Sequence, residues 1–113
     1  MLELWFTEKR TLVDFRRGPL GPYFDGFAAQ LKTRGYSRGC ARSILGKSCL
    51  FNAFLIENGI PRPAQISQHV VEAFLDLYLA HTRTACAYSP RAEVQRSLRH
   101  LLAYLVHVKA LSA

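Results

Sequence analysis

The stretch that most constrains the fold is the segment 35–60, which contains a helix start, a helical apolar face and a helix stop. Ser37 is a suitable N-cap, because its hydroxyl can accept a hydrogen bond from an unpaired N–H group of the first turn. Gly59 is a suitable stop, since glycine adopts the left-handed conformation at a helix end without steric cost. The sequence therefore predicts one long helix over residues 38–58.

Two sides of this helix carry different residue types. One side repeats at steps of three and four residues and predicts contact with a core through Ala41, Ile44, Ser48, Phe51 and Leu55. Arg38 and Arg42 stand one turn apart on another side, which can face an anion, and Gly46 follows along their row. Gly46 costs the helix about 1 kcal/mol relative to alanine. That cost suits either a close approach of a phosphate or a crossing by another helix.

Two further helices are predicted before and after it. Residues 22–33 begin with Pro22, which suits the first turn of a helix, and end before a glycine stop at Gly35. Residues 68–80 follow Ser67, another suitable N-cap. The core residues expected from their spacing are Phe24, Phe27, Ala28, Leu31, Val70, Val71, Phe74, Leu75 and Tyr78.

A last helix is predicted over residues 90–109. Ser89 and Pro90 stand in the preferred order of N-cap and first helical residue. Its expected core stripe is Val94, Leu98, Leu101, Leu105 and Val108. The segment 81–88 before it contains no glycine or proline and is expected to stay partly helical. With no convincing strand in the sequence, these four helices predict an all-α bundle whose packing angles the sequence does not choose.

The remaining segments predict less regular structure. Residues 1–18 have no clear period and could form a short strand, a helix, or an arm that packs its aromatic side chains on the body. Trp5 is interpreted as a packing anchor. Arg62 stands between two prolines, which hold it in an extended link. We therefore expect an N-terminal extension, 1–18, and a single helical domain, 19–113.

The charge of the chain is strongly uneven. It has 15 Lys and Arg residues against eight Asp and Glu, a net charge of +7 over 113 residues. Residues 30–50 contain basic residues and no acidic one, and the basic residues there are Lys32, Arg34, Arg38, Arg42 and Lys47. Such a local positive field favours a polyanion such as nucleic acid or an acidic lipid surface. The alternative is a basic surface that only maintains solubility.

Composition argues against membrane insertion and export. No apolar run approaches the roughly 20 residues that span a bilayer. The first charges follow the first apolar residues, the wrong order for a secretory signal. Cys40, Cys49 and Cys86 are an odd number without a CxxC pair, so neither a disulfide framework nor a zinc site is suggested. We interpret them as small packing residues in a reducing cytoplasm.

Catalytic motifs are missing from the sequence. It contains no glycine-rich phosphate loop, no HExxH phrase and no spacing that suggests a catalytic triad. His100 and His107 fall on similar sides of the last helix and could hold a metal, although surface or half-buried histidines are far commoner. No cofactor or metal is expected. The basic run remains the feature that folding does not explain, because a guanidinium can bind phosphate oxygens or the edge of guanine.

Five short phrases occur in order along the chain. They are the helical stretch Tyr23–Leu31; Gly35, Tyr36, Ser37 and Ile44; Phe51, Phe54, Leu55, Gly59 and Ile60; Ile66, Ser67, His69, Val70, Phe74 and Leu75; and Ser89, Pro90, Leu98, Arg99, Leu101, Tyr104 and Leu105. In this order and with these gaps, the chain from Pro22 to Leu111 resembles the core-binding domain of tyrosine recombinases and phage integrases. Cys40 departs from the family, which often has a hydroxyl residue there, and Gly39 and Gly46 loosen the central helix.

The resemblance implies a fold, a partner and a division of labour. The fold would be a SAM-like four-helix orthogonal bundle, the N-terminal domain of an integrase, with its second and fourth helices facing the major groove of double-stranded DNA. Catalysis would lie in a C-terminal catalytic domain of the same protein, and other recombinase protomers would bind the same DNA. A cytoplasmic, nucleoid-associated protein encoded by a bacterium or phage is expected. Because the sequence stops about where an interdomain linker should begin, we expect one domain of a longer protein or a gene without its catalytic half.

The predicted DNA-binding residues lie on the second and fourth helices. Phosphate contacts are expected from Arg38, Arg42, Lys47, Arg91 and Arg99, base contacts from Ser43 and Gln95, and Cys40 and Ser89 complete the set. A competing hypothesis is a helical protein-interaction domain, in which the aromatic residues of 1–27 and the surface of the last helix dock a partner or a second copy. A helix-turn-helix regulator is disfavoured because the link around Arg62 is too stiff and too long.

Overall fold

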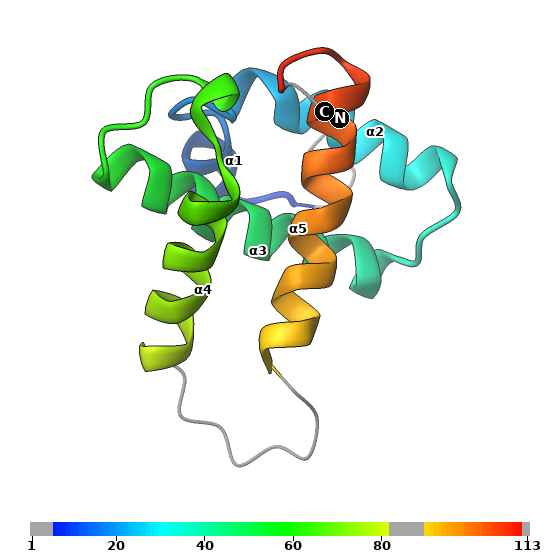
Figure 1. Cartoon of the computed structure of the whole chain (residues 1–113). Helices are drawn as coiled ribbons and strands as arrows, with labels where there is room; N and C mark the ends of the chain where they lie inside the picture. The colour runs from blue at the N-terminus through cyan, green and yellow to red at the C-terminus, as the bar shows by residue number, and fades with distance from the viewer. Residues whose placement is uncertain (1–5, 82–89, 112–113) are drawn as a thin grey trace.

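A computed structural model describes residues 6–81 and 90–111 of the chain (Figure 1). These residues form five α-helices: α1 (Lys9–Phe15), α2 (Gly21–Thr33), α3 (Arg38–Glu57), α4 (Gln68–His81) and α5 (Pro90–His107). A short 3-10 turn, Pro63–Gln65, precedes α4. Within these residues no strand occurs, so the all-α prediction is confirmed and the four predicted helices are all present.

The ends of α3 are those that the sequence predicts. The Ser37 hydroxyl accepts a hydrogen bond of 3.2 Å from the Cys40 N–H, and Gly59 has a positive φ of 67° beyond the last turn. The five residues predicted to face the core are all buried. Leu45 and Asn52 are buried as well, which widens the buried side of α3 beyond the predicted row.

Helix α3 is the element against which α1, α2 and α5 pack. Figure 1 shows α4 and α5 running antiparallel beside each other, with α3 crossing behind them. Phe74 of α4 contacts Phe51 and Phe54 of α3, with ring centroids 5.2 and 5.5 Å apart. The crosswise arrangement lets one side of α3 cover the inner faces of several neighbours at once.

A close approach between α2 and α5 depends on Gly26. The Tyr104 ring lies 5.5 Å from that of Phe27, and a side-chain carbon at Gly26 would collide with the Tyr104 hydroxyl. Burial raises the pKa of this hydroxyl. Any side chain at position 26 would therefore displace Tyr104 from the α2–α5 contact.

The N-terminal part of the chain is more regular and better packed than its sequence indicates. Helix α1 ends at Phe15, which is buried and packs against Phe24 and Phe6 with centroids 5.1 and 4.9 Å apart. Of the three possibilities open for residues 1–18, the described part is a helix. Trp5 lies outside the described residues.

The end of α5 differs from the prediction. The helix stops at His107, Lys109 adopts a positive φ of 63°, and the Ala110 N–H donates to the Leu105 carbonyl at 2.8 Å. This is the hydrogen-bond pattern of a Schellman motif with lysine where glycine is usual. The prediction that Val108 belongs to the core is therefore wrong, because it lies past the last turn and is 38% exposed.

None of the described helices is both long and apolar enough to cross a lipid bilayer.

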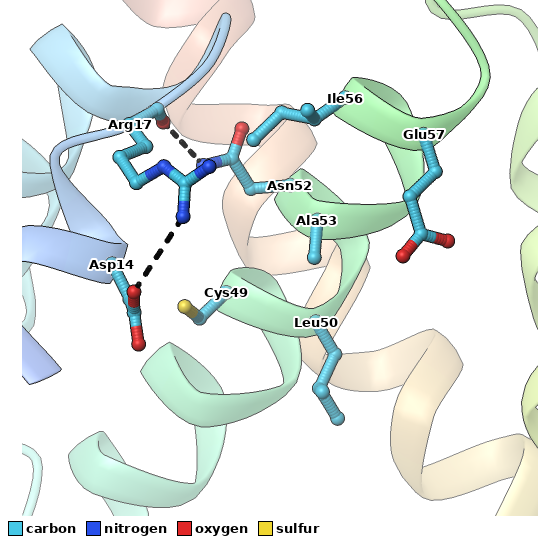
Figure 2. Close-up of a pocket in the computed structure, with 8 residues that line it drawn as sticks. All are labelled: Asp14, Arg17, Cys49, Leu50, Asn52, Ala53, Ile56 and Glu57. Carbon is cyan, nitrogen blue, oxygen red and sulfur yellow. Dashed lines mark hydrogen bonds and ion pairs between the residues drawn. The ribbon is translucent and has the colours of Figure 1, made fainter.

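Asn52 is a buried polar residue that joins α3 to the turn between α1 and α2. It is 1% exposed; its Oδ1 accepts from the Leu20 N–H at 3.2 Å, and its Nδ2 donates to the Arg17 carbonyl at 2.6 Å (Figure 2). The side chain thus satisfies two backbone groups that have no helical partner where the chain turns between α1 and α2.

Replacing Asn52 with alanine should lower the free energy of unfolding by about 2–4 kcal/mol, because a buried donor and a buried acceptor lose their partner. Urea unfolding followed by circular dichroism measures the change. The control is Asn58→Ala, since the exposed Asn58 side chain donates only to the Phe54 carbonyl within its own helix, and it should change stability by less than about 0.5 kcal/mol. Equal effects of the two substitutions would contradict this account of Asn52.

Candidate nucleic-acid interface

The first half of α3 presents an open outer side. Arg38 and Arg42 are exposed there. Gly39 and Gly46 lie on the same outer side, and a side-chain carbon at either position would meet no described atom within 4 Å. Of the two interpretations of Gly46, a helix crossing is therefore wrong for the described part of the chain. The backbone of α3 is accessible to a partner at this place.

The two arginines adjoin the start of α1. The guanidinium carbon of Arg42 lies over the Phe6 ring, 5.2 Å from its centroid. A cavity of about 240 Å³ opens between the two elements, lined by Phe6, Thr7, Glu8, Thr11, Arg38 and Arg42. The N-terminal segment thus forms one edge of the arginine surface, a relationship that the sequence could not show because about 30 residues separate the two.

Lys47 has a different role from its predicted one of a free phosphate contact. Its side chain is only 16% exposed, and its Nζ donates to Ser43 Oγ at 2.7 Å and to Glu93 Oε1 at 3.3 Å. This ion pair links α3 to the first part of α5. The positive charge of Lys47 is therefore balanced within the protein, and a phosphate would have to compete with the Glu93 carboxylate for it.

A second contact joins α5 to the turn just before α3. The Tyr36 hydroxyl lies 3.4 Å from His100 Nδ1, and the two rings meet edge to face with centroids 5.4 Å apart. His100 therefore packs against the start of α3. The described residues contain no cluster of three or more potential metal ligands.

The two contacts define a seam between α3 and α5. Cys40 lies two turns before Lys47 and Ser43 lies one turn before it, so both belong to this side of α3. Arg96 lies within one turn of both Glu93 and His100, and it is exposed. Arg96 therefore lies on the same side of α5 as the two residues that form these contacts. The predicted set did not include Arg96, because helix spacing alone does not tell which side of α5 meets α3.

Other predicted residues of α5 turn away from this seam. On an ideal helix Arg99 and Gln95 project about 120° and 160° from Glu93. Arg99 is exposed and continues the outer surface of α5 next to Arg96, whereas Gln95 is half-buried. Ser89 and the side chain of Arg91 lie outside the described residues.

Helix α4 carries negative charge. This helix contains no Lys or Arg, and its acidic residues Glu72 and Asp76 are exposed. The described arginines of the proposed surface lie on the first half of α3 and on α5 instead. The charge of the bundle is therefore uneven, which favours one orientation toward a polyanion.

The cysteines have unlike surroundings. Cys40 is exposed, so its interpretation as a packing residue is wrong, because the first turn of α3 projects beyond the core. Cys49 is half-buried in a cavity of about 400 Å³ between α1 and α3, beside Asp14 (Figure 2). Burial, and secondarily the negative charge of Asp14, raises the pKa of the Cys49 thiol. Cys86 lies outside the described residues.

Comparisons with known proteins give one finding that bears on this surface. Over 96 residues, 85% of this chain, the sequence is 30% identical to a Sinorhizobium fredii (strain NBRC 101917 / NGR234) protein named "Putative integrase/recombinase y4rF". The match covers 22% of that protein, so the chain spans about a fifth of its relative's length. No family model matches the chain, and no solved structure matches it. The similarity supports the predicted relationship to integrases and recombinases.

Iodoacetamide should modify Cys40 faster than Cys49 at pH 7.5. The raised pKa of Cys49 leaves a smaller thiolate fraction at a given pH, and the thiolate is the form that reacts. Peptide mapping by mass spectrometry at timed intervals gives both rates. Asp14→Asn should raise the rate at which Cys49 is modified, since it removes the negative charge beside the thiol. It should leave the rate at Cys40 unchanged. Faster modification of Cys49 than of Cys40 in the native protein would contradict the burial described here.

Proposed function

We propose that this chain is a DNA-binding domain, the core-binding domain of a site-specific tyrosine recombinase. In this proposal residues 19–113 form the helical domain, and α3 and α5 hold one half-site of a recombination target. Strand exchange would be catalysed by a separate C-terminal domain of the same protein, with further protomers bound to the same DNA. The supporting observation is the open first half of α3, where two exposed arginines flank an accessible backbone and the exposed arginines Arg96 and Arg99 lie on α5.

The charge and the shape of the first half of α3 suit contact with the phosphate backbone of DNA. Within residues 6–81 and 90–111, no carboxylate lies within ion-pair distance of Arg38 or Arg42. The first turn of α3 contains no acidic residue, so the positive end of its dipole adds to their charge. Gly39 and Gly46 have no side chain to project from the helix beside the charged residues. A DNA duplex can therefore come close to the backbone of α3.

Each predicted residue has a place in this proposal. Arg38, Arg42, Arg91 and Arg99 would bind phosphates, and Arg96 would join them beside the seam. Lys47 would contribute only when it leaves Glu93. Ser43 and Gln95 would contact base edges, while Ser89 and the exposed Cys40 would lie near the DNA backbone. The name of the relative, an integrase/recombinase, supports a recombinase-related domain.

The double substitution Arg38→Gln, Arg42→Gln should weaken duplex binding and flatten its salt dependence. Five phosphate contacts predict a slope of log affinity against log salt of about −4 to −5, and the loss of two should reduce its magnitude by about 1.8. Fluorescence anisotropy with a labelled duplex at several salt concentrations gives both values.

The matched control is Arg62→Gln, which removes one equally exposed positive charge beyond the far end of α3. It should leave the slope unchanged. If the native protein shows no duplex binding at low salt, or a slope near zero, the proposed function is wrong.

A second candidate function, self-association, is favoured by exposed apolar residues. Of the aromatic residues predicted to dock a partner, Phe15, Phe24 and Phe27 are buried in the core and not available. The two most exposed large apolar residues in the described part of the chain are Val13 on α1, 59% exposed, and Leu50 on α3, 50% exposed. A cavity of about 300 Å³ between α3 and α4 is lined by Leu50, Ala53, Phe54, Glu57, Phe74, Leu77 and Tyr78.

The occupant that fits this cavity is α1 of a second copy. Val13 there is surrounded by Lys9, Arg16 and Arg17, whereas Glu57 lies at the rim of the cavity, so the two surfaces are complementary in charge. Leu50→Asp should abolish any dimer seen by sedimentation velocity without DNA, and Val108→Asp, a similar change at the end of α5, should not. A native protein that stays monomeric at high concentration rules this candidate out.

A further inference from the structure

We propose that the cavity between the start of α1 and the start of α3 binds one phosphate group of a nucleic-acid backbone, and that Phe6 is a positioning residue for Arg42 in this site. The inference rests on the proposed DNA-binding function and assigns a part of the site to residues 6–11. The predicted DNA-binding residues include none from that segment. The ligand class is a phosphodiester, a singly charged anion with two free oxygens.

The position of Arg42 is the first observation. Its guanidinium lies over the Phe6 ring at 5.2 Å from the centroid. A guanidinium that stacks on an aromatic face keeps its N–H donors in its own plane, where they remain free to bind an anion. The contact with Phe6 therefore holds the Arg42 side chain in place and leaves its N–H groups available to a phosphate.

Phe6 is itself held by the core. Its ring packs on Phe15 at 4.9 Å between centroids, and Phe15 is buried against Phe24 of α2. Arg42 is thus connected to the interior of the bundle through a chain of aromatic contacts, although its own side chain is exposed. A preorganised arginine loses less rotamer freedom on binding than one that moves freely in solvent.

The lining of the cavity is the second observation. Arg38 and Arg42 contribute two positive charges, and Thr7 contributes a hydroxyl group that can donate to a phosphate oxygen. About 240 Å³ is enough for a phosphate group. Among the described residues neither arginine has a carboxylate partner, so an anion would not displace an ion pair formed there.

Glu8 disfavours the binding of an anion in this cavity. Its carboxylate also lines the cavity, and its Oε2 accepts from the Thr11 hydroxyl at 3.5 Å. A negative charge at this edge lowers the affinity for a phosphate. Removing the Glu8 charge should tighten binding, whereas removing the contact between Phe6 and Arg42 should weaken it. These opposite changes give a sensitive test of the site.

The experiment measures duplex affinity of the full chain with three replacements of Phe6 and Glu8. Phe6→Leu keeps apolar packing on Phe15 but removes the aromatic face, and should weaken binding about two- to five-fold, the equivalent of one exposed cation–π contact. Phe6→Trp keeps an aromatic face and should restore binding. In the Arg42→Gln background Phe6→Leu should cause no further loss, because Phe6 acts through Arg42.

Glu8→Gln gives a second measurement that does not depend on the Phe6 variants folding. It should tighten duplex binding, whereas Glu57→Gln, the same change at the far end of α3, should have a smaller effect. If Phe6→Leu binds DNA as tightly as the native protein or more tightly, or if Glu8→Gln and Glu57→Gln are equivalent, the phosphate site is wrong and the proposed function still stands. If the native chain fails to bind a duplex at all, both proposals are wrong.

Discussion

The structure depends on the division of the α3 surface into a buried side and an open side. One broad side of this helix, centred on Ile44, Ser48 and Phe51, is buried against neighbouring helices. A helix that packs on several others at once needs a wide apolar side, and the burial of Leu45 and Asn52 supplies that width. The outer side of the first half is left open, so the same element can organise the core and offer a binding surface. A change on the buried side would therefore disturb both.

Hydrogen bonds of buried polar side chains fix the parts that apolar packing alone leaves free. Asn52 satisfies two backbone groups where the chain turns between α1 and α2. The Lys47–Glu93 ion pair and the Tyr36–His100 contact set how α5 lies along α3. Apolar contacts are not directional, whereas these contacts require particular atoms to meet. They therefore determine which side chains of the two helices share an edge, and with it the position of the candidate interface.

The charges of this chain fall into two groups with different roles. Lys47 is paired with Glu93 and Arg16 with Asp25, so these basic residues connect helices. Arg38 and Arg42 have no such partner among the described residues and lie beside an accessible backbone. Net charge alone cannot separate the two groups. We propose nucleic acid as the partner of Arg38 and Arg42, and the contact of Arg42 with Phe6 would add the N-terminal segment to the surface that this partner meets.

By itself the sequence determined the helices, their starts and most of their buried residues. Ser37, Ser67 and Gly59 act through contacts within a few residues, and the apolar rows follow from the helical period, so local chemistry was sufficient. It failed at the end of α5, where Lys109 adopts a conformation usual for glycine, and at α1, whose seven residues are too short for a clear period. Tertiary structure alone decided that Lys47 is paired, that Arg96 reaches the seam, and that Phe6 lies under Arg42. Each of these joins residues at least 36 positions apart, or depends on which side of one helix meets another, and neither distance in space nor packing angle is encoded in local spacing.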